Sequence, residues 1–150
     1  MPSRRGWRWD GANSRLDVDV DGTTVARFDD GTGDIEIVSG TINVADGGTV
    51  SQLTSKSTAV ELNTHSGQIT MDDASLADDA IVSFTVTNSN VAATDVVIVN
   101  HSSGGTLGSY VVQAHTIASG SFKISVENIS GGSLAETPII SFAVIKGASS

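Results

Sequence analysis

The sequence predicts an all-β protein: an antiparallel β-sandwich or jelly-roll-like domain with an N-terminal extension of short strands. Three observations lead to this prediction. Of the 150 residues, 39% are hydrophobic but only 5% are aromatic, and the abundance of Val, Ile, Thr, Ser and Gly favours pleated sheet. Apolar and polar residues alternate along several short segments. Gly- and Ser-rich stretches such as "HSSGGTLG" and "NISGGSLAET" separate those segments, as turns do in all-β domains.

The chain is expected to divide into residues 1–50 and residues 51–147. Residues 1–12 show little periodicity and are predicted to form an arm. Four very short candidate strands follow, "RLDVDV", "TTVARF", "DIEIV" and "TINV". They contain few apolar residues, and burial contributes only about 25 cal/mol per Å² against roughly 1–2 kcal/mol of backbone entropy per ordered residue. We therefore expect another subunit or the following domain to stabilise this segment.

The stretch "LDVDVDGTTVARF" (16–28) allows two interpretations. Its three aspartates and Gly22 match the start of an EF-hand calcium loop. Such a loop needs a bidentate Glu at its twelfth position, which here is Phe28. The apolar residues alternate with the aspartates, and Asp21-Gly22 is a favoured two-residue turn. The pattern predicts a β-hairpin, with opportunistic cation binding by its acidic edge as the alternative.

Residues 51–147 are predicted to form the sandwich. Within three of its segments the apolar residues share one face, which indicates strands with one buried side. The candidate strands run over 59–63, 67–71, 80–88, 95–101, 109–116, 120–128 and 137–146. The expected core positions are Val82, Phe84 and Val86, then Phe122, Ile124 and Val126, then Ile140, Phe142 and Val144.

Charge and cysteine content exclude several functions. Residues 1–15 hold four arginines and one aspartate, a net charge of +3, whereas the rest of the chain has four bases and sixteen acids, a net charge of −12. So acidic a body would repel nucleic-acid phosphates. The absence of cysteine excludes disulfides and thiolate chemistry. The apolar runs are too short to cross a membrane, and no signal peptide is evident.

The polar residues do not converge on an active site. His65, His101 and His115 lack the short ligand spacings of a zinc site. His101, the serines after it and Asp95 could suggest a catalytic triad, but their loop is composed like a hairpin turn. The acid pairs at 72–73 and 78–79 fit a solvated loop. We therefore expect no catalytic residue, no metal and no cofactor, and a protein that is not an enzyme.

The N-terminal stretch "SRRGWRWDG" is the more promising binding segment. Trp and Arg are the residues most enriched at binding hot spots. We predict that Arg4, Arg5, Trp7, Arg8 and Trp9 contact a partner. The alternative is that the two tryptophans alternate along a first strand and pack on their own domain.

Residues 53–147 resemble a small domain that recurs in virion proteins of tailed bacteriophages. The segments that carry the resemblance are "GQITM", "VSFTVTNS", "DVVIVNHSSGGT", "FKISVEN", "GGSLAE" and "FAVIKG". The resemblance implies a structural role on the exterior of the virion and a homotrimer, and it brings no catalytic residue with it.

Together these observations predict a capsid decoration, or cement, protein that binds the major capsid protein and stabilises the shell. Residues 1–50 would attach to the shell, and residues 51–147 would form a projecting knob. A tail-fibre or receptor-binding tip, which could bind a host surface glycan, is one alternative. A carbohydrate-binding or glycan-hydrolysing module is another, although residues 51–147 offer little beyond Tyr110 as an exposed aromatic. No nucleic acid or membrane is expected as a partner.

Overall fold

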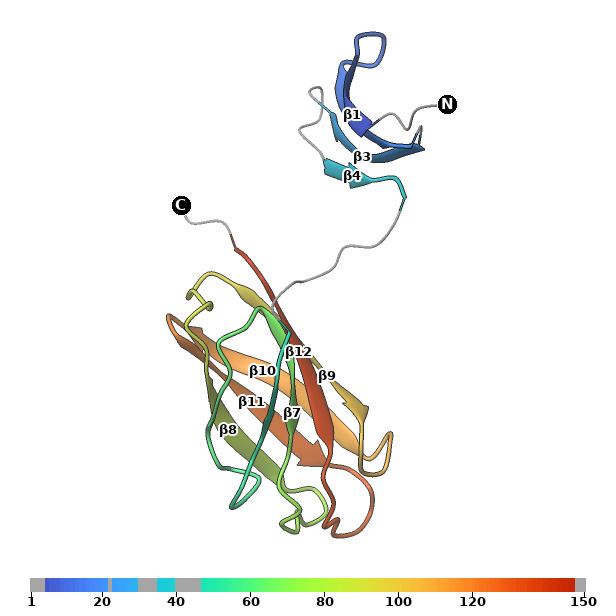
Figure 1. Ribbon diagram of the computed structural model, residues 1–150. Helices are drawn as coiled ribbons and strands as arrows, with labels where there is room; N and C mark the ends of the chain where they lie inside the picture. The colour runs from blue at the N-terminus through green and yellow to red at the C-terminus, as the bar shows by residue number, and fades with distance from the viewer. Residues whose placement is uncertain (1–4, 22, 30–34, 40–46, 148–150) are drawn as a thin grey trace. The chain divides into compact units, whose positions relative to one another are not determined.

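The computed structural model describes residues 5–21, 23–29, 35–39 and 47–147. These residues form twelve β-strands and no α-helix, which confirms the predicted all-β class. The strands make three four-stranded sheets. The chain divides into two compact units, an N-terminal unit of residues 1–43 and a sandwich unit of residues 44–150 (Figure 1).

The N-terminal unit is one antiparallel sheet in the order β1-β2-β3-β4. The predicted hairpin is confirmed, because Val20 lies opposite Thr23 and leaves a two-residue turn between β2 and β3. Asp21 in that turn has a φ of 51°, in the left-handed region that such turns require. The strands are β1 (Arg5–Asp10), β2 (Arg15–Val20), β3 (Thr23–Asp29) and β4 (Ile35–Ile37).

The arm predicted over residues 1–12 is wrong where the structure describes it, since residues 5–10 are strand β1. This strand pairs with β2 along its whole length. The pairing places Arg8 opposite Asp17 and Asp10 opposite Arg15, and opposite charges across an antiparallel pair stabilise it. The candidate strand "TINV" (41–44) lies outside the described residues.

The sandwich unit packs two four-stranded sheets face to face (Figure 1). One has the order β10-β11-β8-β6 and the other β5-β7-β12-β9. Each of the seven predicted segments contains a strand. The strands are β5 (Thr49–Ser51), β6 (Val60–Glu61), β7 (Ser66–Thr70), β8 (Ile81–Thr87), β9 (Val96–Ser103), β10 (Tyr110–Ala118), β11 (Ser121–Asn128) and β12 (Ile139–Ile145).

Two short edge strands pair in parallel, so the sheets of the sandwich are mixed rather than purely antiparallel. β5 pairs with β7 in parallel, and β6 pairs with β8 in parallel. Because β5 belongs to a sheet of the sandwich, that unit begins before the division expected at residue 50. The jelly-roll connection pattern stays a prediction.

The core of the sandwich lies between its two sheets. Phe122 and Phe142 meet there from opposite sheets, with ring centroids 5.5 Å apart. The predicted core faces are confirmed, with Val82 half-buried and the other eight positions buried. All buried hydrophobic side chains of the described chain belong to this unit: Val60, Ile69, Met71, Leu76, Phe84, Val86, Val91, Tyr110, Phe122, Ile124, Val126, Ile140, Phe142 and Val144.

Candidate functional site

The N-terminal sheet has one apolar face, which we call the Trp face. Side chains alternate across a strand, so the pairing register decides which residues share a face. Trp9 lies opposite Leu16, which lies opposite Phe28 on the next strand. The Trp face comprises Trp7 and Trp9 of β1, Leu16, Val18 and Val20 of β2, Thr23, Ala26 and Phe28 of β3, and Ile35 and Ile37 of β4, and Arg5 pairs with Val20 at its end.

The Trp face is exposed in the described structure. Trp7 is 69% exposed, Trp9 59% and Ile35 66%. The Trp7 and Phe28 rings contact each other with centroids 6.2 Å apart, so the aromatic side chains form a continuous surface. From the usual areas of aromatic side chains, the exposed apolar area is roughly 500–700 Å². A patch of that size marks an interaction surface.

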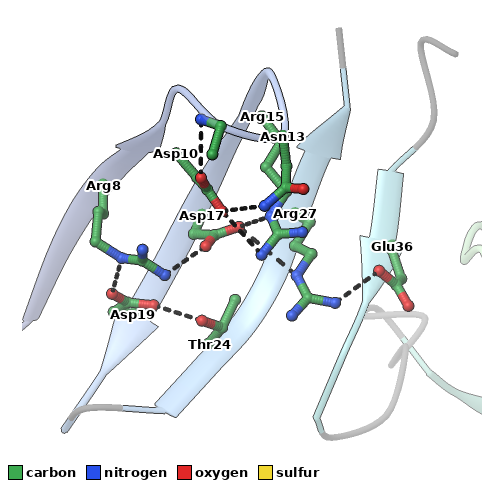
Figure 2. A network of polar contacts seen from close by, with 10 residues as sticks. Arg8, Asp10, Asn13, Arg15, Asp17, Asp19, Thr24, Arg27 and Glu36 are labelled. Atoms are coloured by element: carbon green, nitrogen blue, oxygen red, sulfur yellow. Dashed lines mark hydrogen bonds and ion pairs between the residues drawn. The ribbon is translucent and has the colours of Figure 1, made fainter. Parts of the chain in front are cut away.

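The opposite face of the same sheet is polar and is organised around Asp17 (Figure 2). The Asp17 side chain is fully buried. One carboxylate oxygen accepts from Arg8 Nη2 at 2.5 Å, and the other accepts from Arg15 Nε at 2.9 Å and lies 3.6 Å from Arg27 Nε. A buried charge needs such partners, because an isolated one is costly. Three strands therefore meet at one carboxylate.

Further hydrogen bonds and ion pairs connect the arginines around Asp17 to neighbouring polar residues. Arg8 Nε donates to Asp19 at 3.1 Å, and Thr24 donates to the same carboxylate at 2.8 Å. These two hydrogen bonds, Thr24 first, lower the pKa of Asp19, while the bond to Asp19 raises the pKa of Arg8. Arg27 reaches Glu36 of β4 at 3.1 Å. All four strands are thus joined by ion pairs.

Two of the hairpin's three aspartates therefore bind arginines. Asp17 and Asp19 use their oxygens on guanidinium groups, which leaves the acidic edge of the predicted hairpin internally neutralised. Across the described residues, no group of three His, Asp or Glu side chains is placed to hold a metal ion. The polar face holds the sheet together, and the Trp face is the surface free to bind.

The structure separates the predicted binding residues. Trp7 and Trp9 lie together on the Trp face, whereas Arg8 is on the other face and turned toward Asp17. Arg5 begins β1, and Arg4 lies outside the described residues. The contributions of β3 and β4 to the Trp face were not predicted. The Asp21-Gly22 turn with regular pairing would have placed Arg27 opposite Leu16, because a two-residue turn fixes which residues of two strands are opposite. A bulge between Val18 and Asp19 shifts the register by one residue and brings Phe28 there instead.

His101, Ser102 and Asp95, whose residue types could have suggested a triad, each bind a different part of the backbone or another side chain. His101 Nε2 lies 2.6 Å from the Gly104 carbonyl, and Ser102 Oγ donates to the Ile139 carbonyl at 3.1 Å. Asp95, at the start of β9, accepts from Lys146 Nζ at 2.5 Å. These groups hold a loop and a strand end in place.

Glu136 fixes the loop between β9 and β10. Its carboxylate accepts from the Thr106 backbone N–H at 2.6 Å and from the Tyr110 hydroxyl at 3.0 Å. These hydrogen bonds, that of Thr106 first, lower the pKa of Glu136. Burial and the Glu136 contact raise the pKa of Tyr110. An adjacent hollow of about 520 Å³ has His101, Leu107 and Tyr110 in its lining, but its two titratable side chains are already engaged with the loop.

A contact between Ser125 and His115 was not anticipated. Ser125 Oγ lies 2.8 Å from His115 Nε2 and 2.6 Å from Ser83 Oγ, on the outer side of the sheet that contains β8, β11 and β10. His115 Nδ1 is 2.8 Å from the Thr116 hydroxyl. In a nucleophilic triad a carboxylate binds the Nδ1 atom of the histidine, and its negative charge stabilises the imidazolium. The Thr116 hydroxyl at His115 Nδ1 has no such charge.

No helix among the described residues has the length and apolar character needed to span a membrane. Comparison of the chain with known protein families, characterised proteins and solved structures finds no match.

Proposed function

We propose that this protein is a capsid decoration protein of a tailed-bacteriophage virion, attached to the major capsid protein through the Trp face of its N-terminal unit. The sandwich unit is the projecting part. The observation that supports this most directly is the Trp face, where Trp7 and Trp9 stand 69% and 59% exposed. The resemblance of residues 53–147 to virion domains supports the structural role.

A single-layer sheet needs a cover for its apolar face. Stable domains bury such a face against a second layer, and the described part of the N-terminal unit contains only one sheet. Its polar face is held by ion pairs around Asp17, which contribute little net stability because desolvation opposes the attraction. A protein surface laid over the Trp face would supply the missing apolar burial.

A protein partner fits this face better than a glycan. Sugars stack on exposed indoles, but they also need polar side chains to hydrogen-bond their hydroxyls. The residues paired across the sheet with Trp7 and Trp9 are Val18 and Leu16, and the described polar residue of the face, Thr23, lies at its end opposite Val20. Trp anchors surrounded by apolar neighbours are typical of protein hot spots.

Several copies acting together would strengthen attachment. In an oligomer each N-terminal unit presents its own Trp face, and simultaneous engagement raises the apparent affinity by roughly 10²–10⁴ where the geometry allows it. We therefore propose a homo-oligomer on the capsid exterior, in which weak individual contacts combine into stable decoration.

The test is cosedimentation of the full chain with empty shells. The double variant Trp7→Ser/Trp9→Ser should lose shell binding while its sandwich unit keeps the unfolding transition of the unchanged protein. Ile81→Ser is the matched control, because Ile81 is 64% exposed on the sandwich and lies outside the proposed contact. Full occupancy of the shells by the double variant would refute the assignment of the Trp face.

A further inference from the structure

The outer face of the sheet β5-β7-β12-β9 carries no charge. The residues of this face alternate along each strand with the buried residues, and the structure describes all of them. The described residues 47–147 hold eight acids and three bases, and none of these is a member of the face, whereas the outer face of the other sheet has Lys123 and Glu127. The uncharged face comprises Thr49, Ser51, Ser66, Gln68, Thr70, Val96, Ile98, Asn100, Ile139, Ser141, Ala143 and Ile145.

One side of the uncharged face is a ridge of large aliphatic side chains. Val96, Ile98 and Ile145 are 56%, 53% and 51% exposed. Val96 lies opposite Ile145, and Ile98 lies opposite Ala143, so the three side chains form one cluster on β9 and β12. We call this cluster the ridge.

The other side of the same face is a hollow. It has a volume of about 510 Å³ and is lined by Gly47, Gly48 and Gly67 together with Ser66, Gln68 and Ser141. A side chain at Gly48 or Gly67 would meet Leu62 rather than the hollow, so the hollow stays open because the serines are short. In the sheet order the hollow lies over β5 and β7, with β12 between it and the β9 edge.

We propose that the ridge of one copy packs into the hollow of a second copy of this chain. Ridge and hollow lie on one face of the sheet. Two copies that meet face to face, with a two-fold axis in the plane of the contact, would therefore fit each ridge into the partner's hollow, as in isologous dimers. Two such acidic chains repel each other, and depletion of charge is the compositional sign of an interface core. The uncharged face meets that condition, which makes an identical chain a suitable occupant.

The size of the face indicates a weak contact. Four strands about 4.8 Å apart and between three and eight residues long present roughly 400 Å² per copy, which is below the roughly 800 Å² of a standard interface. The contact should therefore form at micromolar concentration. It does not depend on shell attachment, since it uses the sandwich unit and leaves the Trp face free.

The experiment is sedimentation velocity of the full chain between roughly 1 and 100 µM, in the Trp7→Ser/Trp9→Ser background so that the Trp face makes no contribution. Ile98→Lys places an unpaired charge in the contact and should raise the dissociation constant about tenfold or more. Gln68→Glu, in the hollow, should weaken association in the same direction. The control Ile81→Lys adds the same charge to the outer face of the other sheet and should change nothing.

Combining Ile98→Lys with Gln68→Glu in one chain gives the decisive result. If the ridge of one copy meets the hollow of the other, the new lysine faces the new glutamate and association returns. A double variant that stays monomeric would overturn the pairing, as would a parent chain that is monomeric throughout or an oligomer that Ile98→Lys leaves intact. The mass should be that of two copies, and a mass of three copies would overturn the two-fold arrangement. Loss of shell binding is measured separately with the tryptophan variants, so the two proposals fail independently.

Discussion

Asp17 is the residue on which the N-terminal sheet depends most. Its carboxylate is fully buried and holds Arg8 and Arg15 at 2.5 and 2.9 Å, with Arg27 next to it. Removing one member of a buried ion pair is more damaging than the pair is stabilising, because the remaining charges lose their compensation.

We expect Asp17→Asn to destabilise the N-terminal unit by about 3–5 kcal/mol. Amide hydrogen exchange of residues 5–29 should accelerate, while exchange in the sandwich core stays unchanged. Asp19→Asn is the control, because the partly exposed Asp19 pair should contribute at most about 1 kcal/mol. Equal exchange in the two variants would argue against Asp17 as the centre of the network.

Asp95 makes the stability of the sandwich unit depend on pH. The Ala92 backbone N–H and the Lys146 ammonium hold the pKa of Asp95 at about 2, against about 3.9 for an unperturbed aspartate. A carboxyl group whose pKa is lower in the folded protein than in the unfolded chain stabilises the fold at pH values above its unfolded pKa. That stabilisation is lost as the pH falls and the carboxylate is protonated. The sign is therefore loss of stability on acidification from about pH 4 to about pH 2.

Acid unfolding of the unchanged chain and of Asp95→Asn checks this prediction. The variant should be less stable at neutral pH, and its unfolding free energy should fall less steeply across the acid range. Parallel curves for the two proteins would show that other carboxylates govern acid unfolding.

At the scale of elements, Lys56 joins loops that are far apart in the sequence. The residue is buried, and its ammonium donates to the Asp72 carbonyl and, at 2.5 Å, to the Glu136 carbonyl. Burial lowers the pKa of Lys56. Gln52 supports the same loop, donating to the carbonyls of Lys56 and Thr58.

Lys56→Met should destabilise the sandwich by roughly 2–5 kcal/mol, because two carbonyls lose their donor in a partly buried position. Denaturant unfolding measures the change. Lys123→Met provides the comparison on an exposed strand position and should stay within about 0.5 kcal/mol of the unchanged chain. A small effect at Lys56 would mean that water replaces the ammonium.

At the scale of the whole molecule, the two units differ in how they are stabilised. The sandwich has all the buried hydrophobic side chains of the described chain, whereas the N-terminal sheet exposes its apolar side chains. We expect residues 44–150 alone to unfold with the same denaturant midpoint as the sandwich transition of the full chain. Residues 1–43 alone should unfold at a much lower denaturant concentration than the sandwich, and a monomeric fragment as stable as the sandwich would contradict the need for a cover.

The fold class, the strands of the sandwich and the hairpin at Asp21-Gly22 could be predicted from the sequence alone. Two-residue alternation and turn chemistry are local properties, so they can be read from neighbouring residues. Residues 5–10 were harder, because "RGWRWD" allowed both an arm and a first strand, and the charges that favour the strand are paired on β2.

Only the tertiary structure decided which side of each sheet is free. Leu16 and Phe28 become one surface with Trp9 through the pairing register, and the same register buries Asp17, which local alternation suggested would face solvent. The acceptors of Lys56 and the ridge and hollow of the uncharged face likewise come from segments far apart in the chain. Such contacts depend on packing between distant residues, which no short stretch of sequence encodes.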